Sequence, residues 1–188
     1  MEMTLPNILT WLRIVMIPVL GLLFLLPAPW ANGAAAFVFA LASVTDWLDG
    51  FLARRWNQAS PFGAFLDPVA DKLIVAIALI IVLVESPTAL VAIPVAVIIG
   101  REIAVSALRE WMAELGQRAS VAVGMTGKVK TALQMVAIVF LLYRHQIEGI
   151  PTWPVGLVML YVAAGLTLYS MVLYLSAAMR TLDRVEQG

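Results

Sequence analysis

Four aspartates stand at helical spacing within one short part of the sequence. Asp49 follows Asp46 by three positions, and Asp71 follows Asp67 by four. Each pair therefore lies on one face of its segment if both segments are helices. If the first helix crosses a membrane inward and the second returns outward, the two faces meet near the same membrane surface. The spacing predicts a cluster of four carboxylates at one end of a helix pair.

Carboxylates within apolar helices need a compensating positive charge. An aspartate in a transmembrane helix costs about 2.5–3.5 kcal/mol on insertion scales, so four together imply a penalty on the order of 10 kcal/mol. One explanation is a buried salt-bridge network with Arg54, Arg55 and Lys72. We favour a divalent metal site, because oxygen ligands without histidine or cysteine suit Mg²⁺, Mn²⁺ or Ca²⁺.

Three small residues share the helix faces of the aspartates, namely Gly50, Ala53 and Gly63. Small residues in membrane helices commonly allow close helix packing. Here they would also leave space beside the metal for a flat or bulky group. The two roles are compatible.

The composition is that of an integral membrane protein. Of the 188 residues, 62% are hydrophobic and 13% are charged, and the mean hydropathy is +0.95. The formal net charge is +0, so no basic field indicates a nucleic-acid partner. The absence of cysteine excludes disulfides, thiolate metal sites and cysteine catalysis.

Six apolar stretches are long enough to cross a bilayer, which takes about 20 residues per helix. Proline, glycine, serine and asparagine mark the breaks between them, and the stretches are 8–26, 31–56, 63–84, 88–115, 127–143 and 153–179. No linker or internal repeat divides the chain. We predict one all-α, polytopic domain over residues 1–188 with six transmembrane helices.

The lysines and arginines are distributed asymmetrically. If the N-terminus is cytoplasmic, all of them except Arg144 lie on or toward the cytoplasmic side, as the positive-inside rule requires. The predicted external loops around Pro29 and Ser86 hold neither residue type. We therefore expect both termini and the aspartate cluster to be cytoplasmic.

The aspartates form part of a longer motif that reads DxxDGxxAR, eight residues, then GxxxDxxxD, from Asp46 to Asp71. This motif resembles, without a departure, the signature of the CDP-alcohol phosphotransferase family. Further stretches are similar to bacterial members that use a phosphorylated glycerol as acceptor. They are LPNILTWLRIVMIP at 5–18, FGAFLDPVADK at 62–72, REIAVSALREWMAELG at 101–116 and GKVKTALQM at 127–135.

The resemblance implies the fold of this family and a reaction in phospholipid biosynthesis in the bacterial cell (inner) membrane. The phosphatidyl group of CDP-diacylglycerol would pass to the C1 hydroxyl of sn-glycerol 3-phosphate, with release of CMP. Two divalent ions, Mg²⁺ or Mn²⁺, would neutralise the pyrophosphate and the departing CMP. By resemblance, Asp46, Asp49 and Asp67 hold the metals, while Asp71 completes the site and acts as general base.

The resemblance also implies where the two substrates bind. Gly50, Ala53 and Gly63 would lie against the cytidine diphosphate of CDP-diacylglycerol, and Arg54 would contact it. The phosphate of the acceptor needs cations of its own. The candidates for that glycerol 3-phosphate site are Arg101, Arg109, Lys128, Arg118 and Lys130.

Arg101 lies deep in an apolar segment, where a charge needs a functional or structural reason. Glu102 and Glu110 directly follow Arg101 and Arg109, and neighbours in a helix are expected to point in different directions.

Two other functions fit parts of the pattern. The acceptor could be inositol phosphate, serine or phosphatidylglycerol, although several cations between Arg101 and Lys130 favour a phosphorylated acceptor over serine. A divalent-cation transporter could use the aspartates as a transit site, but no second acidic cluster occurs near Arg144. Family members commonly form homodimers in the membrane. The resemblance therefore implies a homodimer here, with membrane lipids around it.

Overall fold

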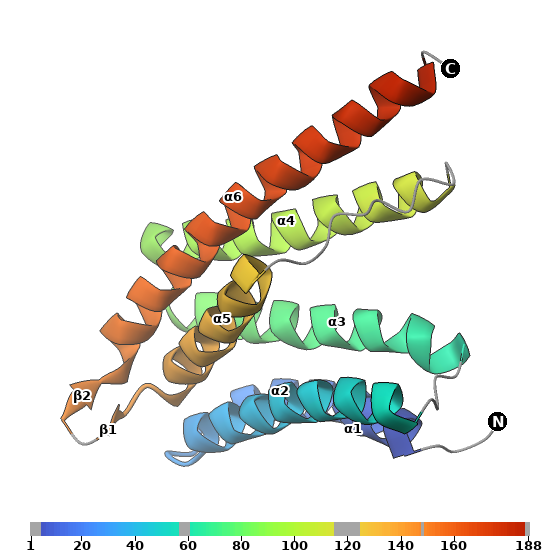
Figure 1. The fold of residues 1–188 in the computed structure, drawn as a ribbon. Helices are drawn as coiled ribbons and strands as arrows, with labels where there is room; N and C mark the ends of the chain where they lie inside the picture. Colours follow the sequence, from blue (N-terminus) through green and yellow to red (C-terminus); the bar gives the residue numbers. More distant parts are fainter. Residues whose placement is uncertain (1–4, 57–60, 115–124, 148, 187–188) are drawn as a thin grey trace.

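The structure, a computed structural model, describes residues 5–56, 61–114, 125–147 and 149–186. Side chains are described over 8–46, 66–114, 129–147, 149–176 and 178–179. Within these ranges the chain forms six helices and one two-stranded hairpin (Figure 1). The elements are α1 (Leu5–Leu25), α2 (Ala31–Trp56), α3 (Pro61–Glu85), α4 (Ala89–Glu114), α5 (Met125–Tyr143), β1 (Gln146–Ile147), β2 (Ile150–Pro151) and α6 (Thr152–Glu186).

The helices form one bundle in which α1, α2, α3 and α4 run roughly alongside one another and α5 and α6 cross them obliquely (Figure 1). α1 packs against α2 and α3, while α5 packs against α2 and α6, and α6 also covers α4. The turns α1–α2 and α3–α4 and the β hairpin lie at one end. The beginning of α1 and the end of α6 lie toward the other end.

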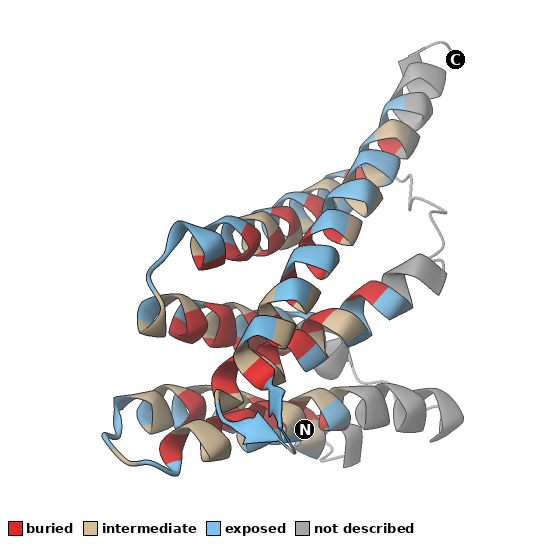
Figure 2. Cartoon of the chain, turned by 90° about the vertical axis from the view of Figure 1, so that its left-hand side faces the viewer, coloured by how far each residue is buried: buried red, intermediate tan, exposed pale blue. Residues whose placement is uncertain are grey.

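The core is a continuous apolar cluster on the inward faces of the helices (Figure 2). Leu20, Phe39, Leu79, Ile98 and Leu141 are fully buried in it. Small residues let the helices approach closely. At Gly156 an added Cβ would lie 3.0 Å from Leu141 Cγ.

Large apolar side chains also cover much of the outer surface, for example Leu22, Phe37, Ile103 and Val158. Water-soluble proteins rarely expose broad apolar surfaces, whereas membrane helices face the lipid with them. Within the described residues, three segments are long and apolar enough to span a membrane. They are Ile8–Leu25, Ala89–Glu114 and Thr152–Ser176. The chain is therefore a mostly helical membrane protein.

The predicted helices agree closely with the observed ones, with two differences. α6 continues to Glu186, beyond the predicted limit at residue 179, because polar residues prolong the helix after the apolar stretch has ended. The loop before α6 contains the hairpin β1–β2, which was not predicted. Its turn includes Gly149 with a φ of 83°, a left-handed conformation that glycine adopts without steric cost.

Candidate active site

A buried arginine on α1 joins the predicted aspartates of α2 and α3. The Arg13 side chain is 0% exposed, and its Nη1 lies 3.3 Å from Asp46 Oδ1. The same nitrogen donates a close hydrogen bond to Asp71 Oδ1. Asp46 and Asp71 are 25 positions apart in sequence, so their approach depends on the packing of three helices. The predicted meeting of these two carboxylates is confirmed.

Thr10 holds the third described aspartate of the motif. Its Oγ1 donates a hydrogen bond to Asp67 Oδ1, and the Thr10 side chain is buried. Thr10 and Arg13 are three positions apart and share a face of α1, while Asp67 and Asp71 are four apart and share a face of α3. α1 therefore binds two aspartates, Asp67 and Asp71, that lie about one helical turn apart on the same face of α3.

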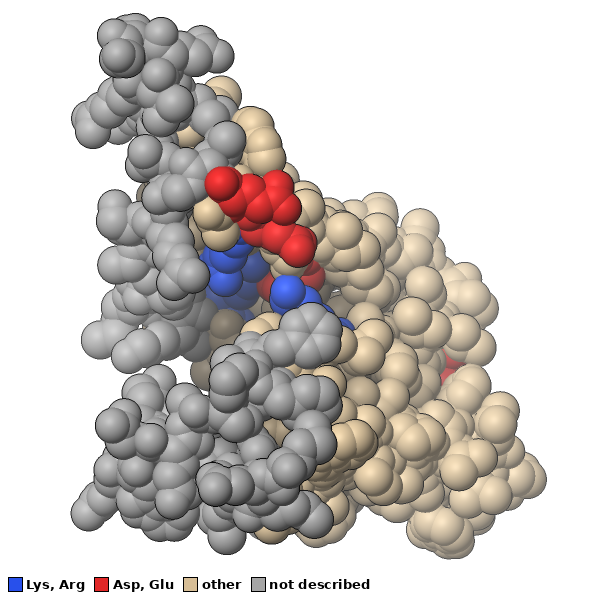
Figure 3. All heavy atoms as spheres, turned by 90° about the vertical axis from the view of Figure 1, so that its right-hand side faces the viewer, with Lys and Arg blue, Asp and Glu red and all other residues tan. Residues whose placement is uncertain are grey.

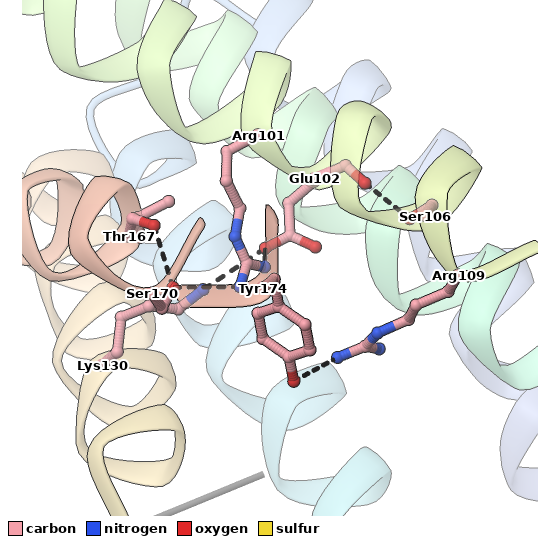
Figure 4. A network of polar contacts seen from close by, with 8 residues as sticks. All are labelled: Arg101, Glu102, Ser106, Arg109, Lys130, Thr167, Ser170 and Tyr174. Atoms are coloured by element: carbon pink, nitrogen blue, oxygen red, sulfur yellow. Dashed lines mark hydrogen bonds and ion pairs between the residues drawn. The ribbon is translucent and has the colours of Figure 1, made fainter. Parts of the chain in front are cut away.

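A second polar network lies between α4, α5 and α6 (Figure 4). Arg101 is 9% exposed, and its Nη1 lies 2.9 Å from Glu102 Oε1. Lys130 Nζ on α5 lies 3.4 Å from the same Glu102 oxygen. The expectation that Glu102 points away from Arg101 is wrong, because the long arginine side chain curls back to its sequence neighbour.

α6 contributes two further members of this network. Arg101 Nη2 donates a hydrogen bond to Ser170 Oγ over 3.1 Å, and Arg109 Nη2 donates one to the Tyr174 hydroxyl over 2.9 Å. The Tyr174 ring also lies between the two guanidinium groups (Figure 4), with its centroid 5.9 Å from Arg101 Cζ and 5.1 Å from Arg109 Cζ. Such cation–π contacts stabilise positive charge at an aromatic face.

The network has a surplus of positive charge. Arg101, Arg109 and Lys130 carry three positive charges, and Glu102 carries the one negative charge among the residues drawn in Figure 4. Arg101 Nε is buried and, within the described part of the chain, has no hydrogen-bond partner. A buried donor without a partner is costly, so this network is suited to receive a further anion.

One cavity of about 610 Å³ extends from Asp46 and Asp71 to Glu102 and Lys130 of the cationic network. Its wall includes Asp46 and Asp71 at one side and Glu102, Glu110 and Lys130 at the other. Much of the remaining wall is apolar, as in many small-molecule sites. Figure 3 shows that most of the described acidic and basic side chains on this face gather in one region, with one acidic patch apart from them at the right.

The chain is similar to known proteins over nearly its whole length. A family model described as CDP-alcohol phosphatidyltransferase matches residues 3–178, which is nearly the whole chain. The chain belongs to this family. The match includes the aspartate helices α2 and α3 and the part of α6 up to residue 178.

Individual members of the CDP-alcohol phosphatidyltransferase family are similar to this chain over almost their full length. A protein of Shigella flexneri serotype 5b (strain 8401) is 55% identical over 180 residues, which cover 95% of this chain and 96% of the relative. A protein of Escherichia coli (strain K12) is 54% identical over the same shares. Both are named CDP-diacylglycerol--glycerol-3-phosphate 3-phosphatidyltransferase.

Several predicted residues of the family motif lie where no side chain is described. Asp49, Gly50, Ala53 and Arg54 are on α2, Gly63 is on α3, Lys128 is on α5, and Arg118 falls between α4 and α5. Among the residues that were described, no group of three or more Asp, Glu, His or Cys side chains is placed to hold a metal. The four-aspartate metal site therefore stays a prediction.

Three residues of the two polar networks, Arg13, Ser170 and Tyr174, are absent from the site residues predicted from the sequence. Arg13 enters the sequence-based orientation only together with the other lysines and arginines, and the apolar pattern of the last helix gives no functional signal at Ser170 or Tyr174. A signal for Arg13 did exist, since a charge in the middle of an apolar helix needs a partner. Its position three residues after Thr10 places both polar groups on one face.

Proposed function

We infer that this protein transfers the phosphatidyl group of CDP-diacylglycerol to sn-glycerol 3-phosphate and releases CMP. The names of relatives 54–55% identical over 95% of the chain support this function. The structural observation that carries it is the cavity, because its wall includes both the converging carboxylates Asp46 and Asp71 and, from the cationic network, Lys130. A transfer between a nucleotide-activated lipid and a phosphorylated alcohol needs both in one space.

The cationic network provides the acceptor site in this proposal. Arg101, Arg109 and Lys130 hold the phosphate of sn-glycerol 3-phosphate, together with Lys128 and Arg118, the other two cations predicted from the sequence. The buried, unsatisfied Arg101 Nε supports a site for a further anion, within the described residues. Anchoring the phosphate there leaves the C1 hydroxyl free to extend along the cavity toward Asp71.

Asp71 is the proposed general base. It lines the cavity, and Arg13 holds its carboxylate in one orientation. A substrate hydroxyl that arrives from the Lys130 side therefore meets a carboxylate that is already oriented to take its proton. Asp71 then takes the hydroxyl proton as the oxygen attacks the phosphorus that bears diacylglycerol. Gly50, Ala53, Arg54 and Gly63 would bind the CDP part, as the family motif implies.

The donor set is compatible with the proposed metals. Asp46 and Asp71 already direct one oxygen each toward a single cationic nitrogen, and carboxylate oxygens are the ligands that Mg²⁺ and Mn²⁺ prefer. Asp46, Asp49, Asp67 and Asp71 would hold two such ions. When bound, the ions would neutralise charge on the pyrophosphate and on the departing CMP.

The membrane arrangement is part of the proposal. Six crossings, cytoplasmic termini and a homodimer in the bacterial inner membrane follow from the sequence pattern and the family. The positions of the start of α1 and the end of α6 at one end of the bundle are compatible with an even number of crossings (Figure 1). The charged region in Figure 3 would then face the cytoplasm.

A direct test measures CMP release by the purified protein in detergent with CDP-diacylglycerol. Release should require both sn-glycerol 3-phosphate and Mg²⁺ or Mn²⁺, and EDTA should abolish it. Serine and inositol phosphate serve as acceptor controls. Equal CMP release with either control would contradict the assigned acceptor.

A further inference from the structure

Glu102 occupies an unusual position for a carboxylate in a site that binds an anion. Its Oε1 lies 2.9 Å from Arg101 Nη1 and 3.4 Å from Lys130 Nζ, so one oxygen contacts two cations. The Glu102 side chain is 30% exposed and forms part of the cavity wall. At the cavity wall it therefore contacts two of the cations that are proposed to bind the phosphate (Figure 4).

A phosphate monoester that enters the network competes with this carboxylate. Both are anions, and both need the same donors on Arg101 and Lys130, which are fixed in place because both residues are buried. If a phosphate replaces Glu102 at either cation, the negatively charged Glu102 carboxylate remains close to the phosphate. The two negative charges repel each other, which weakens phosphate binding.

We propose that Glu102 determines acceptor affinity by competing with the acceptor's phosphate for Arg101 and Lys130. This inference rests on the proposed function and adds to it a residue that weakens phosphate binding. Glu102 thereby prevents the site from holding phosphate monoesters too tightly. It acts on phosphate affinity through the two cations.

The benefit of weaker binding follows from the reaction. The transfer forms a new ester at the acceptor's hydroxyl and breaks the pyrophosphate linkage of CDP-diacylglycerol, and the acceptor's own phosphate is unchanged. The lipid product therefore carries the same phosphate monoester that anchored the acceptor. A site that bound this group very tightly would retain its product, so Glu102 assists product release by returning to Arg101 and Lys130.

Glu102 could instead serve only to connect α4 with α5. The two roles differ in their response to substitution. If Glu102 is only a connector, both Glu102→Gln and Glu102→Asp should loosen the cations and weaken phosphate binding. If Glu102 is a competitor, Glu102→Gln should tighten phosphate binding, because the shape is kept and the charge is lost, while Glu102→Asp should stay near wild type.

The test titrates inorganic phosphate and sn-glycerol 3-phosphate into purified wild type, Glu102→Gln, Glu102→Asp and Glu110→Gln by calorimetry. Glu110 is the matched control, because it lines the same cavity but lies eight positions, about 12 Å, further along α4. We expect Kd for both anions to fall about tenfold in Glu102→Gln, and to change less than about threefold in the other two variants. In turnover assays, KM for the acceptor and kcat should fall together in Glu102→Gln, and inhibition by added lipid product should increase.

Thermal unfolding keeps the test informative if Glu102→Gln is less stable. Phosphate should then raise the Tm of Glu102→Gln by more than it raises that of wild type, whatever the starting value. Unchanged or weaker phosphate binding by Glu102→Gln, or an equal gain in Glu110→Gln, would overturn the inference. If wild type itself neither binds nor uses sn-glycerol 3-phosphate, the proposed function fails instead.

Discussion

Replacing Arg13 by methionine tests whether this residue holds the acidic end of the bundle together. Methionine keeps much of the length of the side chain and removes the charge, which leaves Asp46 and Asp71 without the cation that they share. The free energy of unfolding should fall, because two neighbouring carboxylates then repel each other. The effect should appear as a lower Tm in detergent with EDTA present.

The size of the effect follows from the geometry. At the 3.3 Å between Arg13 Nη1 and Asp46 Oδ1, two unit charges interact by about 5 kcal/mol at an effective dielectric constant of about 20. The carboxylate side chains of Asp46 and Asp71 are 41% and 35% exposed, so water weakens the attraction. We therefore expect a loss of about 3 kcal/mol, which corresponds to a Tm lower by about 6–12 °C for a chain of this size.

Lys72→Met provides the control. Lys72 lines the same cavity but is exposed, so its removal should lower the Tm by no more than about 2 °C. Mg²⁺ should raise the Tm of Arg13→Met more than that of wild type, because the carboxylates have lost their internal cation. Equal melting of Arg13→Met and Lys72→Met in EDTA would refute the reasoning.

Three further outcomes are expected. Asp71→Asn should retain binding of CDP-diacylglycerol but lose at least about 100-fold in kcat if Asp71 is the general base, and near-normal turnover would remove it from that role. Arg101→Ala or Lys130→Ala should raise KM for sn-glycerol 3-phosphate more than KM for the lipid, as measured by CMP release with each substrate varied. Gly156→Ile should destabilise the α5–α6 contact by about 1–3 kcal/mol in thermal unfolding, because an added Cβ meets Leu141 at 3.0 Å, whereas Gly165→Ile should have little effect because its Cβ position is open.

The helices were predictable because their signal is local. Apolar stretches bounded by proline, glycine and serine specify where each helix begins and ends, and the observed Ala31–Trp56 of α2 coincides with the predicted range. The meeting of Asp46 with Asp71 was also predictable, because spacing sets the helix face and two successive helices that run in opposite directions bring the two faces to one end. The hairpin β1–β2 was not, since two residues per strand carry no periodic pattern.

The partners of the charged residues were harder to predict, because they depend on tertiary packing. Arg13 binds Asp71 across a separation of 58 positions, and Arg101 binds Ser170 across 69. No pattern among neighbouring residues indicates contacts between residues so far apart in the sequence. The pairing of Arg101 with Glu102 was missed for another reason: backbone geometry separates neighbouring Cβ atoms, but a flexible arginine can fold back toward the next residue.

The position of Tyr174 along α6 bears on how a water-soluble substrate reaches the site. Tyr174 follows the first residue of α6, Thr152, by about 22 positions, which at 1.5 Å per residue is about 33 Å, close to the hydrocarbon thickness of a bilayer. The apolar segment that could span the membrane ends almost at the same point, at Ser176. A phosphorylated alcohol arriving from water would thus meet Arg109 and Tyr174 at the edge of the hydrocarbon core. Its charge would not have to cross that core.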